Sequence, residues 1–199
     1  RFHIHRSGGN DQAELLAAAD AEQAALQLDS AALLPYRAAF DTFARDYLAW
    51  LHRHEAKGWR FDSGEVDRCC APPDLDVVAL EGRLDRIDLH GAGAAMLIDY
   101  KTGSREKVKK RVAEPLEDTQ LAFYAALLTD EVHEAPPRAV YLSLAEREAP
   151  KSFEHDDVAL SAALLIDGLS ADLAALRAGA GAPALGEGDV CRSCEMRGL

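Results

Sequence analysis

The sequence predicts an α/β fold, with a central mixed sheet flanked by helices and with extra helices at the N-terminal end. Residues 1–57 carry alanine- and leucine-rich helical patterns, and residues 58–180 alternate between strand-like and helical segments. A chain of 199 residues is also long enough to bury one good core. We therefore expect a single domain over residues 1–199: the helical part, the core, and a linker with a cysteine-containing tip at residues 181–199.

The helical part is expected to hold two helices, at residues 11–29 and 33–56. Apolar side chains of the second helix follow helical spacing and form a stripe that belongs in the core: Phe40, Phe43, Tyr47, Trp50 and Leu51. His52 and His54 end this helix, and because a helix C-terminus favours cationic histidine, we predict that both form a solvated cap. A strand at residues 59–68 is expected to follow.

The next segment is predicted to be a β-hairpin. Its two arms, residues 77–89 and 94–103, are rich in β-branched and apolar residues and flank a glycine-containing turn. If the hairpin is symmetric about Ala92, Asp85 and Asp99 face each other. Facing residues project to the same side of the sheet with Cβ atoms about 5 Å apart.

Two facing aspartates need a compensating cation, because like charges repel and Asp is unfavourable in a strand. Leu97 and Ile98 indicate a strand covered on both faces, where a charged Asp99 is costly unless it is paired or coordinated. Hard ions such as Mg²⁺ or Mn²⁺ take carboxylate ligands, so Asp85 and Asp99 are candidate metal ligands. Lys101 shares the strand face of Asp99 and is placed to orient an attacking water. The alternative is a surface hairpin whose Asp and Lys side chains are solvated or pair with each other.

The segment after Lys101 is the most basic part of a chain whose net charge is −12. We interpret it as a loop that makes sequence-independent phosphate contacts through Arg105, Lys107, Lys109, Lys110 and Arg111. The alternative is an ordinary solvated loop.

A proline and two acids at residues 115–118 mark the start of the next helix. Gln120 and Tyr124 lie four residues apart on one face of this helix, where we expect them to line the catalytic cleft. The alternative is a solvated Gln120 beside a half-buried Tyr124. A strand at residues 138–144 and a helix at residues 156–178 complete the expected core.

Cysteine usage points to a reducing compartment. There are four cysteines and no signal peptide, and we expect no apolar run long enough to span a membrane, so we predict a cytoplasmic protein without membrane contact. Cys69 and Cys70 are expected to serve in packing. Cys191 and Cys194 form a C-x-x-C pair, which fits a metal site, a redox pair or two idle thiols. A zinc site there would need two further ligands.

Three motifs in order, GRLDRID at residues 82–88, IDYKTG at 98–103 and QLAFY at 120–124, resemble the RecB family of PD-(D/E)xK nucleases. The likeness is strongest to the AddB-like and CRISPR-adaptation exonucleases. It implies a restriction-endonuclease-like core. It also implies the catalytic residues by position, with the first two as metal ligands: Asp85, Asp99, Lys101, Gln120 and Tyr124.

The function that this resemblance implies is a DNA exonuclease dependent on Mg²⁺ or Mn²⁺. Such an enzyme acts on single strands or duplex ends during recombination or repair, with a helicase domain or subunit as its partner. One alternative from another class is a catalytically inactive module for DNA-end binding or assembly in a helicase–nuclease complex. A nuclease that acts on RNA or at a restriction-type site is a further alternative. The intact set of two acids and a lysine favours an active enzyme.

The resemblance also bears on the two ends of the chain. Many AddB-like nucleases carry a [4Fe-4S] cluster on one cysteine before the nuclease core and three after it. Cys191 and Cys194 match the first two of those three, and the chain ends where the third is expected, so we expect a fragment of a longer protein. The family's active-site histidine is expected at or just before the first residue, which makes His3 and His5 weaker candidates. Glu65 is a weaker candidate for an additional acid.

Overall fold

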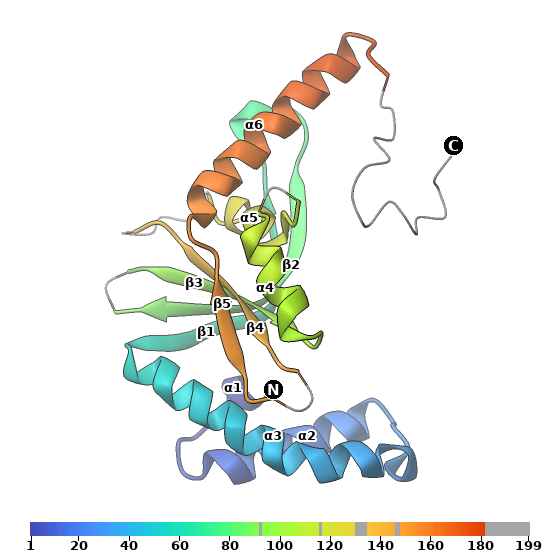
Figure 1. Ribbon diagram of the computed structural model, residues 1–199, viewed down its shortest axis with the longest axis vertical. Helices are drawn as coiled ribbons and strands as arrows, with labels where there is room; N and C mark the ends of the chain where they lie inside the picture. The colour runs from blue at the N-terminus through green and yellow to red at the C-terminus, as the bar shows by residue number, and fades with distance from the viewer. Residues whose placement is uncertain (92, 116, 130–134, 146–147, 182–199) are drawn as a thin grey trace.

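The computed structural model in Figure 1 describes residues 1–91, 93–115, 117–129, 135–145 and 148–181. The elements follow in this order: α1 (Phe2–His5), α2 (Asp11–Ala25), α3 (Ser30–Ala56), β1 (Trp59–Cys70), the short 3-10 helix η1 (Pro73–Leu75), β2 (Leu80–His90), β3 (Ala95–Lys101), α4 (Arg105–Ala113), α5 (Gln120–Ala126), β4 (Arg138–Ser143), β5 (Lys151–Glu154) and α6 (Val158–Arg177).

The five strands form one sheet in the order β1-β2-β3-β4-β5. β3 and β4 run parallel, whereas the other neighbouring strands are antiparallel. The helical part of the chain covers one face of the sheet, and α4, α5 and α6 lie toward the other (Figure 1). A mixed sheet between helices confirms the predicted fold class.

The core is divided by the sheet, because successive side chains of a strand point to opposite faces. Leu97 packs on the α5 side together with Tyr141, whereas Ile98 packs on the α3 side together with Val140. Leu97 and Ile98 are each 1% exposed, which confirms a strand covered on both faces. A polar residue in the middle of β3 is therefore buried either on the α5 side or on the α3 side of the sheet.

The hairpin of β2 and β3 has the predicted register. Arg86 pairs with Ile98 and Ile87 with Leu97, and the pairing continues with the same offset toward the turn. The turn residue Ala92 lies outside the described residues. One step further along this register, Asp85 comes opposite Asp99.

The aromatic stripe of α3 is confirmed as core for Tyr47, Trp50 and Leu51, whereas Phe40 and Phe43 are only half-buried. The prediction for His54 is wrong, because this side chain is 9% exposed and its Nε2 lies 2.7 Å from Asp88 Oδ2 of β2. The helix end faces the sheet there rather than solvent. His52 is exposed, as expected of a cap residue.

Two elements differ from the sequence analysis. The basic segment is not a loop but the helix α4, because Lys, Arg and Glu are good helix formers and Val108 gives the helix an apolar anchor in the core. The edge strand β5 was not predicted. β1 extends to Cys70, which is buried and directs its Sγ at the carbonyl oxygen of Ala126, whereas Cys69 is exposed, so the packing prediction is confirmed for Cys70 only.

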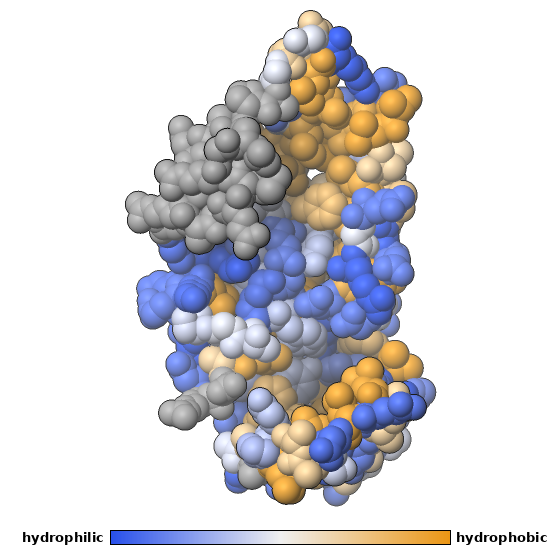
Figure 2. All heavy atoms as spheres, turned by 90° about the vertical axis from the view of Figure 1, so that its right-hand side faces the viewer, coloured by the Kyte–Doolittle hydropathy of each residue, from blue (hydrophilic) through white to orange (hydrophobic). Residues whose placement is uncertain are grey.

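α6 is more apolar than the sequence analysis recognised. By length and composition alone it is able to cross a membrane, with a mean hydropathy of 1.6 over a window that is 17% buried. The same test is passed by core helices of soluble proteins, and α6 packs on α5 and η1, with Val158, Ser161 and Ala162 buried. Figure 2 shows apolar side chains toward the α6 end and hydrophilic side chains across the middle of this face. A cytoplasmic protein without membrane contact stays a prediction.

Candidate active site

Five predicted site residues converge between β2, β3 and the first turn of α5. Asp85 lies on β2, Asp99 and Lys101 lie on β3, and α5 begins at Gln120 and carries Tyr124 one turn later. Because residues 97, 99 and 101 share one face of β3, the acid and the lysine point to the side where α5 packs.

Asp99 is buried between an amide and an ammonium group. The side chain is 2% exposed, and Oδ1 accepts a hydrogen bond from Gln120 Nε2 at 2.8 Å. Oδ2 forms an ion pair with Lys101 Nζ at 2.6 Å. Burial raises the pKa of Asp99, and Lys101 offsets this only in part. A buried carboxylate in this state fits a cation ligand.

Asp85 approaches Asp99 from the neighbouring strand. Its Oδ2 accepts a hydrogen bond from the backbone N–H of Tyr100 at 2.9 Å, and its charge is one of the causes that raise the pKa of Asp99. No group of three or more His, Cys, Asp or Glu side chains in the described parts of the chain is arranged to hold a metal. Mg²⁺ needs only one or two protein carboxylates when water and substrate phosphate complete its shell. Asp85 and Asp99 therefore fit a Mg²⁺ or Mn²⁺ ion.

Gln120 connects the acid and the lysine. Its Oε1 accepts from Lys101 Nζ at 2.7 Å, while its Nε2 donates to Asp99 Oδ1 and, at 3.0 Å, to the Tyr124 hydroxyl. These contacts fix which way the amide points. The structure thus brings Gln120 and Tyr124 into one hydrogen-bonded cluster with the residues of β3.

Glu65 of β1 influences this cluster electrostatically. It adopts a left-handed backbone conformation, with φ of +53°, and its carboxylate pairs with Arg83 Nε at 3.0 Å. Burial raises the pKa of Tyr124, and the charges of Asp99, Asp85 and Glu65 add to this effect. Glu65 is exposed, so its carboxylate is reachable from solvent.

Tyr141 is a neighbour of the site that the sequence analysis missed. In the parallel register it pairs with Asp99, and its ring centroid lies 5.0 Å from Lys101 Nζ. Its hydroxyl donates to Asp118 Oδ1 at 2.5 Å, and Asp118 pairs with Arg111 at 2.7 Å. Burial raises the pKa of Tyr141 well above its usual range. Only the pairing of β4 with β3 identifies this residue.

The basic residues of α4 are partly neutralised within the protein. Arg105 pairs with Glu148 at 2.6 Å, Arg111 with Asp118, and Lys110 more loosely with Glu114 at 3.7 Å. Two other lysines are exposed and form no ion pair within the described residues: Lys107 and Lys109. The free positive charge of α4 is therefore concentrated at these two residues.

Other candidate residues lie elsewhere. His3 contacts Arg86 at 2.8 Å on the α3 side of the sheet, away from the face of Asp99, and His5 is exposed. Cys191 and Cys194 lie outside the described residues.

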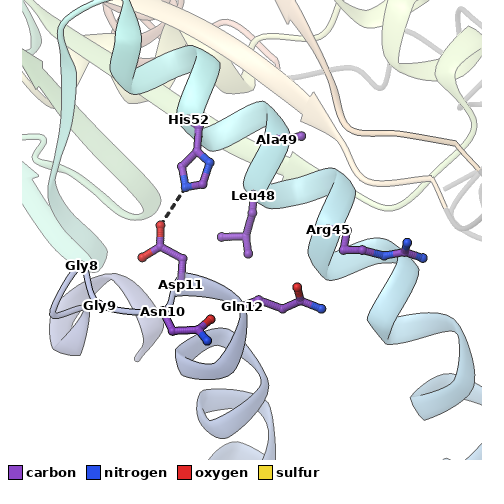
Figure 3. A pocket seen from close by; sticks show the side chains of 9 residues that line it. All are labelled: Gly8, Gly9, Asn10, Asp11, Gln12, Arg45, Leu48, Ala49 and His52. Atoms are coloured by element: carbon purple, nitrogen blue, oxygen red, sulfur yellow. Dashed lines mark hydrogen bonds and ion pairs between the residues drawn. The ribbon is translucent and has the colours of Figure 1, made fainter.

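A cavity of about 510 Å³ opens between the start of α2 and α3, lined in part by Gly8 and Arg45 (Figure 3). Its acid, Asp11, is already bonded to His52 at 2.7 Å and to Arg6 at 2.5 Å. The cavity belongs to the helical part of the chain and is separate from the cluster around Asp99.

A mixed sheet that carries two acids and a lysine on adjacent strands is the arrangement expected of a metal-dependent nuclease. The chain belongs to the PD-(D/E)XK nuclease superfamily, whose family model matches residues 1–199. None of the curated proteins compared with the chain matches it. Membership identifies a nuclease-type phosphodiesterase, which implies a DNA substrate, and nucleases of this superfamily typically use Mg²⁺ or Mn²⁺.

Proposed function

We propose that the chain is a DNA exonuclease domain, dependent on Mg²⁺ or Mn²⁺, that hydrolyses phosphodiester bonds at single strands or duplex ends during recombination or repair. The observation that carries this proposal is the pair of carboxylates on adjacent strands: Asp99 is buried with a raised pKa, and Asp85 stands beside it on β2. Two acids so placed beside one lysine leave negative charge that a divalent cation would offset.

In this proposal Asp85 and Asp99 hold the metal ion. When bound, the metal supplies Lewis acidity at the phosphate and promotes formation of the nucleophile. The Lys101 ammonium group donates hydrogen bonds to the attacking water and to a phosphate oxygen, and so stabilises the charge that develops there. Gln120 holds Lys101 and Asp99 in one orientation through the amide contacts at 2.7 and 2.8 Å. The Tyr124 hydroxyl accepts a further hydrogen bond from the Gln120 amide and so helps to hold its orientation.

DNA is proposed to approach along α4. Lys107 and Lys109 are exposed and form no ion pair with the described residues, and such lysines bind phosphates without reading sequence. Arg105, Lys110 and Arg111 then make a smaller contribution than their charge indicates, because acids of the chain already contact them. The net charge of −12 disfavours a strand on most of the remaining surface. A basic helix beside an otherwise acidic surface fits an enzyme that takes one strand or one end.

The finer assignments rest on the sequence motifs. We propose membership of the RecB-like branch, a helicase domain or subunit as partner, and, in a longer protein, an iron–sulfur cluster that includes Cys191 and Cys194. Their support is the order of the GRLDRID, IDYKTG and QLAFY motifs together with the C-x-x-C pair.

The test is Mn²⁺-dependent cleavage of end-labelled single-stranded DNA by the wild-type chain and by Asp99→Asn. We expect the variant to lose about 10³-fold or more in rate, because several kcal/mol of transition-state stabilisation depend on the metal. Asp167→Asn, at an exposed position of α6, is the matched control and should cleave like wild type. If neither wild type nor Asp99→Asn cleaves and both bind DNA ends equally well, the enzymatic proposal is wrong and an end-binding module is the better description.

A further inference from the structure

A second charged cluster lies behind the candidate site, on the α3 side of the sheet. Arg86 and Asp88 belong to the same motif as Asp85 but sit at the alternate strand positions. Arg86 is 1% exposed and Asp88 is fully buried. The guanidinium group binds the carboxylate through two hydrogen bonds, Nε to Oδ1 at 2.6 Å and Nη2 to Oδ2 at 2.8 Å.

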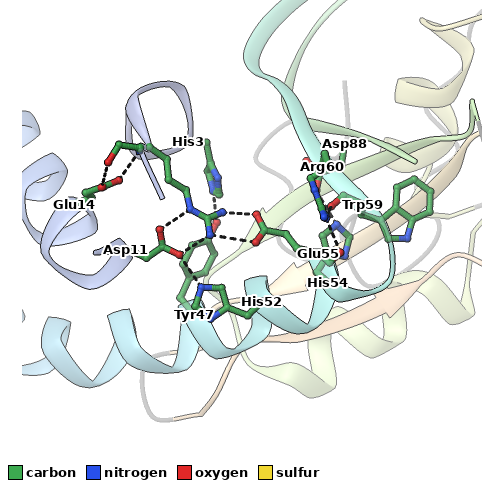
Figure 4. Close-up of polar contacts among 12 residues, drawn as sticks. His3, Asp11, Glu14, Tyr47, His52, His54, Glu55, Trp59, Arg60 and Asp88 are labelled. Carbon is green, nitrogen blue, oxygen red and sulfur yellow. Dashed lines mark hydrogen bonds and ion pairs between the residues drawn. The ribbon is translucent and has the colours of Figure 1, made fainter. Parts of the chain in front are cut away.

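The helical part of the chain encloses this ion pair. His54 Nε2 lies 2.7 Å from Asp88 Oδ2, and Tyr47 Oη accepts from Arg86 Nη1 at 3.0 Å. His3 Nε2 lies 2.6 Å from Tyr47 Oη and 2.8 Å from Arg86 Nη1. Because Arg86 Nη1 can only donate, His3 Nε2 accepts from it, and burial lowers the pKa of His3 to about 3, which keeps the ring neutral. Figure 4 shows His3 beside Tyr47 and, further along α3, His54 beside Asp88.

Aromatic rings close the cluster to water. The Arg86 guanidinium lies 5.7 Å from the Trp50 ring and 5.5 Å from the Phe61 ring, and His3 stacks on Phe61. A buried ion pair is tolerated only when its remaining hydrogen-bonding groups are satisfied, and its geometry is then tightly constrained. We call Arg86, Asp88, His54, Tyr47 and His3 the rear network.

The rear network touches the backbone that carries the candidate metal ligands. Arg86 directly follows Asp85 in β2, and its Nη1 also donates to Tyr100 Oη at 3.4 Å. Tyr100 in turn follows Asp99, and its backbone N–H donates to Asp85 Oδ2 at 2.9 Å. Arg86 and Tyr100, the sequence neighbours of the two acids, are therefore held by contacts on the α3 side of the sheet. The Tyr100 amide in turn holds the Asp85 carboxylate.

We propose that the rear network is a positioning device that keeps Asp85 in its metal-binding orientation through Arg86 and Tyr100. This inference rests on the proposed function, because it takes Asp85 as a metal ligand. Its members do not touch the metal or the DNA; they are positioning residues. It also gives the helical part a role in the site, since that part supplies His3, Tyr47 and His54.

The test compares three variants of the full chain. His54→Leu removes the donor to Asp88, and His54→Gln retains an Nε2–H donor for it. His52→Leu makes the same change on the same helix at an exposed residue outside the network. Two readouts are measured on folded protein: the dissociation constant of Mn²⁺ alone, by electron paramagnetic resonance, and the hydrogen exchange of the Tyr100 amide. The exchange is referred to the Leu144 amide, which follows β4 and donates to the carbonyl oxygen of Lys101 at 2.8 Å, outside the rear network.

We expect His54→Leu to raise the Mn²⁺ dissociation constant about tenfold and to speed exchange at Tyr100 about tenfold relative to Leu144. His54→Gln should return both values to within about threefold of wild type, and His52→Leu should match wild type. If His54→Leu does not fold, Tyr47→Phe replaces it, because this change removes two network hydrogen bonds and keeps the ring.

The outcomes separate the inference from the proposed function. If His54→Leu only lowers the melting temperature, and leaves the Mn²⁺ dissociation constant and the ratio of Tyr100 to Leu144 exchange unchanged, the network has a structural role only. That outcome would overturn the inference but not the proposed function. If wild type binds Mn²⁺ no more tightly than Asp99→Asn, the proposed metal site fails, and the inference fails with it.

Discussion

Gln120 offers a direct test of how the candidate site is organised, because one amide contacts both the acid and the lysine of β3. We predict that Gln120→Met, which keeps the length of the side chain and removes its polar atoms, reduces kcat for DNA cleavage. Asp99 loses a donor at 2.8 Å and Lys101 loses an acceptor at 2.7 Å.

The size of the loss follows from burial. A hydrogen bond to a charged group contributes about 1.5–3 kcal/mol. Asp99 is 2% exposed, so its lost bond counts in full, whereas Lys101 is 20% exposed and water replaces part of its loss. A total of about 2–3 kcal/mol corresponds to a decrease in kcat of about 30- to 150-fold.

The assay is steady-state cleavage of end-labelled single-stranded DNA with saturating Mn²⁺, from which kcat and KM are obtained separately. Gln23→Met is the matched control, because this residue lies in α2 and its amide donates to Ser30 Oγ, far from the sheet. A kcat within about threefold of wild type would refute the reasoning. A change in KM alone would mean that Gln120 contacts the DNA strand instead of orienting Lys101 and Asp99.

Four further predictions follow from the same contacts. Burial raises the pKa of Asp99, so the unfolded state ionises this group more readily and the stability of wild type falls as the pH rises through the folded-state pKa. Asp99→Asn should therefore melt at a higher temperature than wild type near neutral pH. Thermal melts followed by circular dichroism should show this difference shrinking toward about pH 4. Asp88→Asn should lower the free energy of unfolding by about 3 kcal/mol in urea denaturation, because it breaks a buried ion pair. Tyr141→Leu should lower kcat about tenfold by removing the ring beside Lys101, whereas Tyr141→Phe should stay within about threefold of wild type. Replacing Lys107 and Lys109 together with Ala should reduce the slope of log affinity against log salt for single-stranded DNA by about 1.4, as measured by fluorescence anisotropy.

The sequence was sufficient for those features that depend on local periodicity. Strand alternation and a short turn predicted the register of β2 and β3, and the apolar pair Leu97 and Ile98 predicted burial on both faces. Helical spacing predicted that Gln120 and Tyr124 share one face of α5, and the structure adds their hydrogen bond at 3.0 Å. These features lie within or between neighbouring elements, where the period of the side chains decides the geometry.

Features that depend on distant segments were not predictable in this way. His54 follows the rule for a helix end when its own helix is considered, but β2 places Asp88 against it. Tyr141 becomes a neighbour of Lys101 only because β4 pairs in parallel with β3. The charge of residues 105–111 favours a solvated loop. Their helix propensity and the packing of Val108 against the core make them part of a helix instead.

The hairpin places two buried carboxylates on opposite faces of the sheet, and their environments explain why one is structural and the other a candidate for chemistry. Burial acts to raise the pKa of Asp88, but hydrogen bonds from His54 and Arg86 outweigh it and hold the pKa below its usual range. At Asp99 burial prevails over the ion pair with Lys101 and, with the charge of Asp85, raises the pKa. A fold retains such an acid at a cost in stability, which selection tolerates where the group has a function. The opposite directions of the two pKa shifts therefore distinguish Asp99 from Asp88 as the candidate for chemistry.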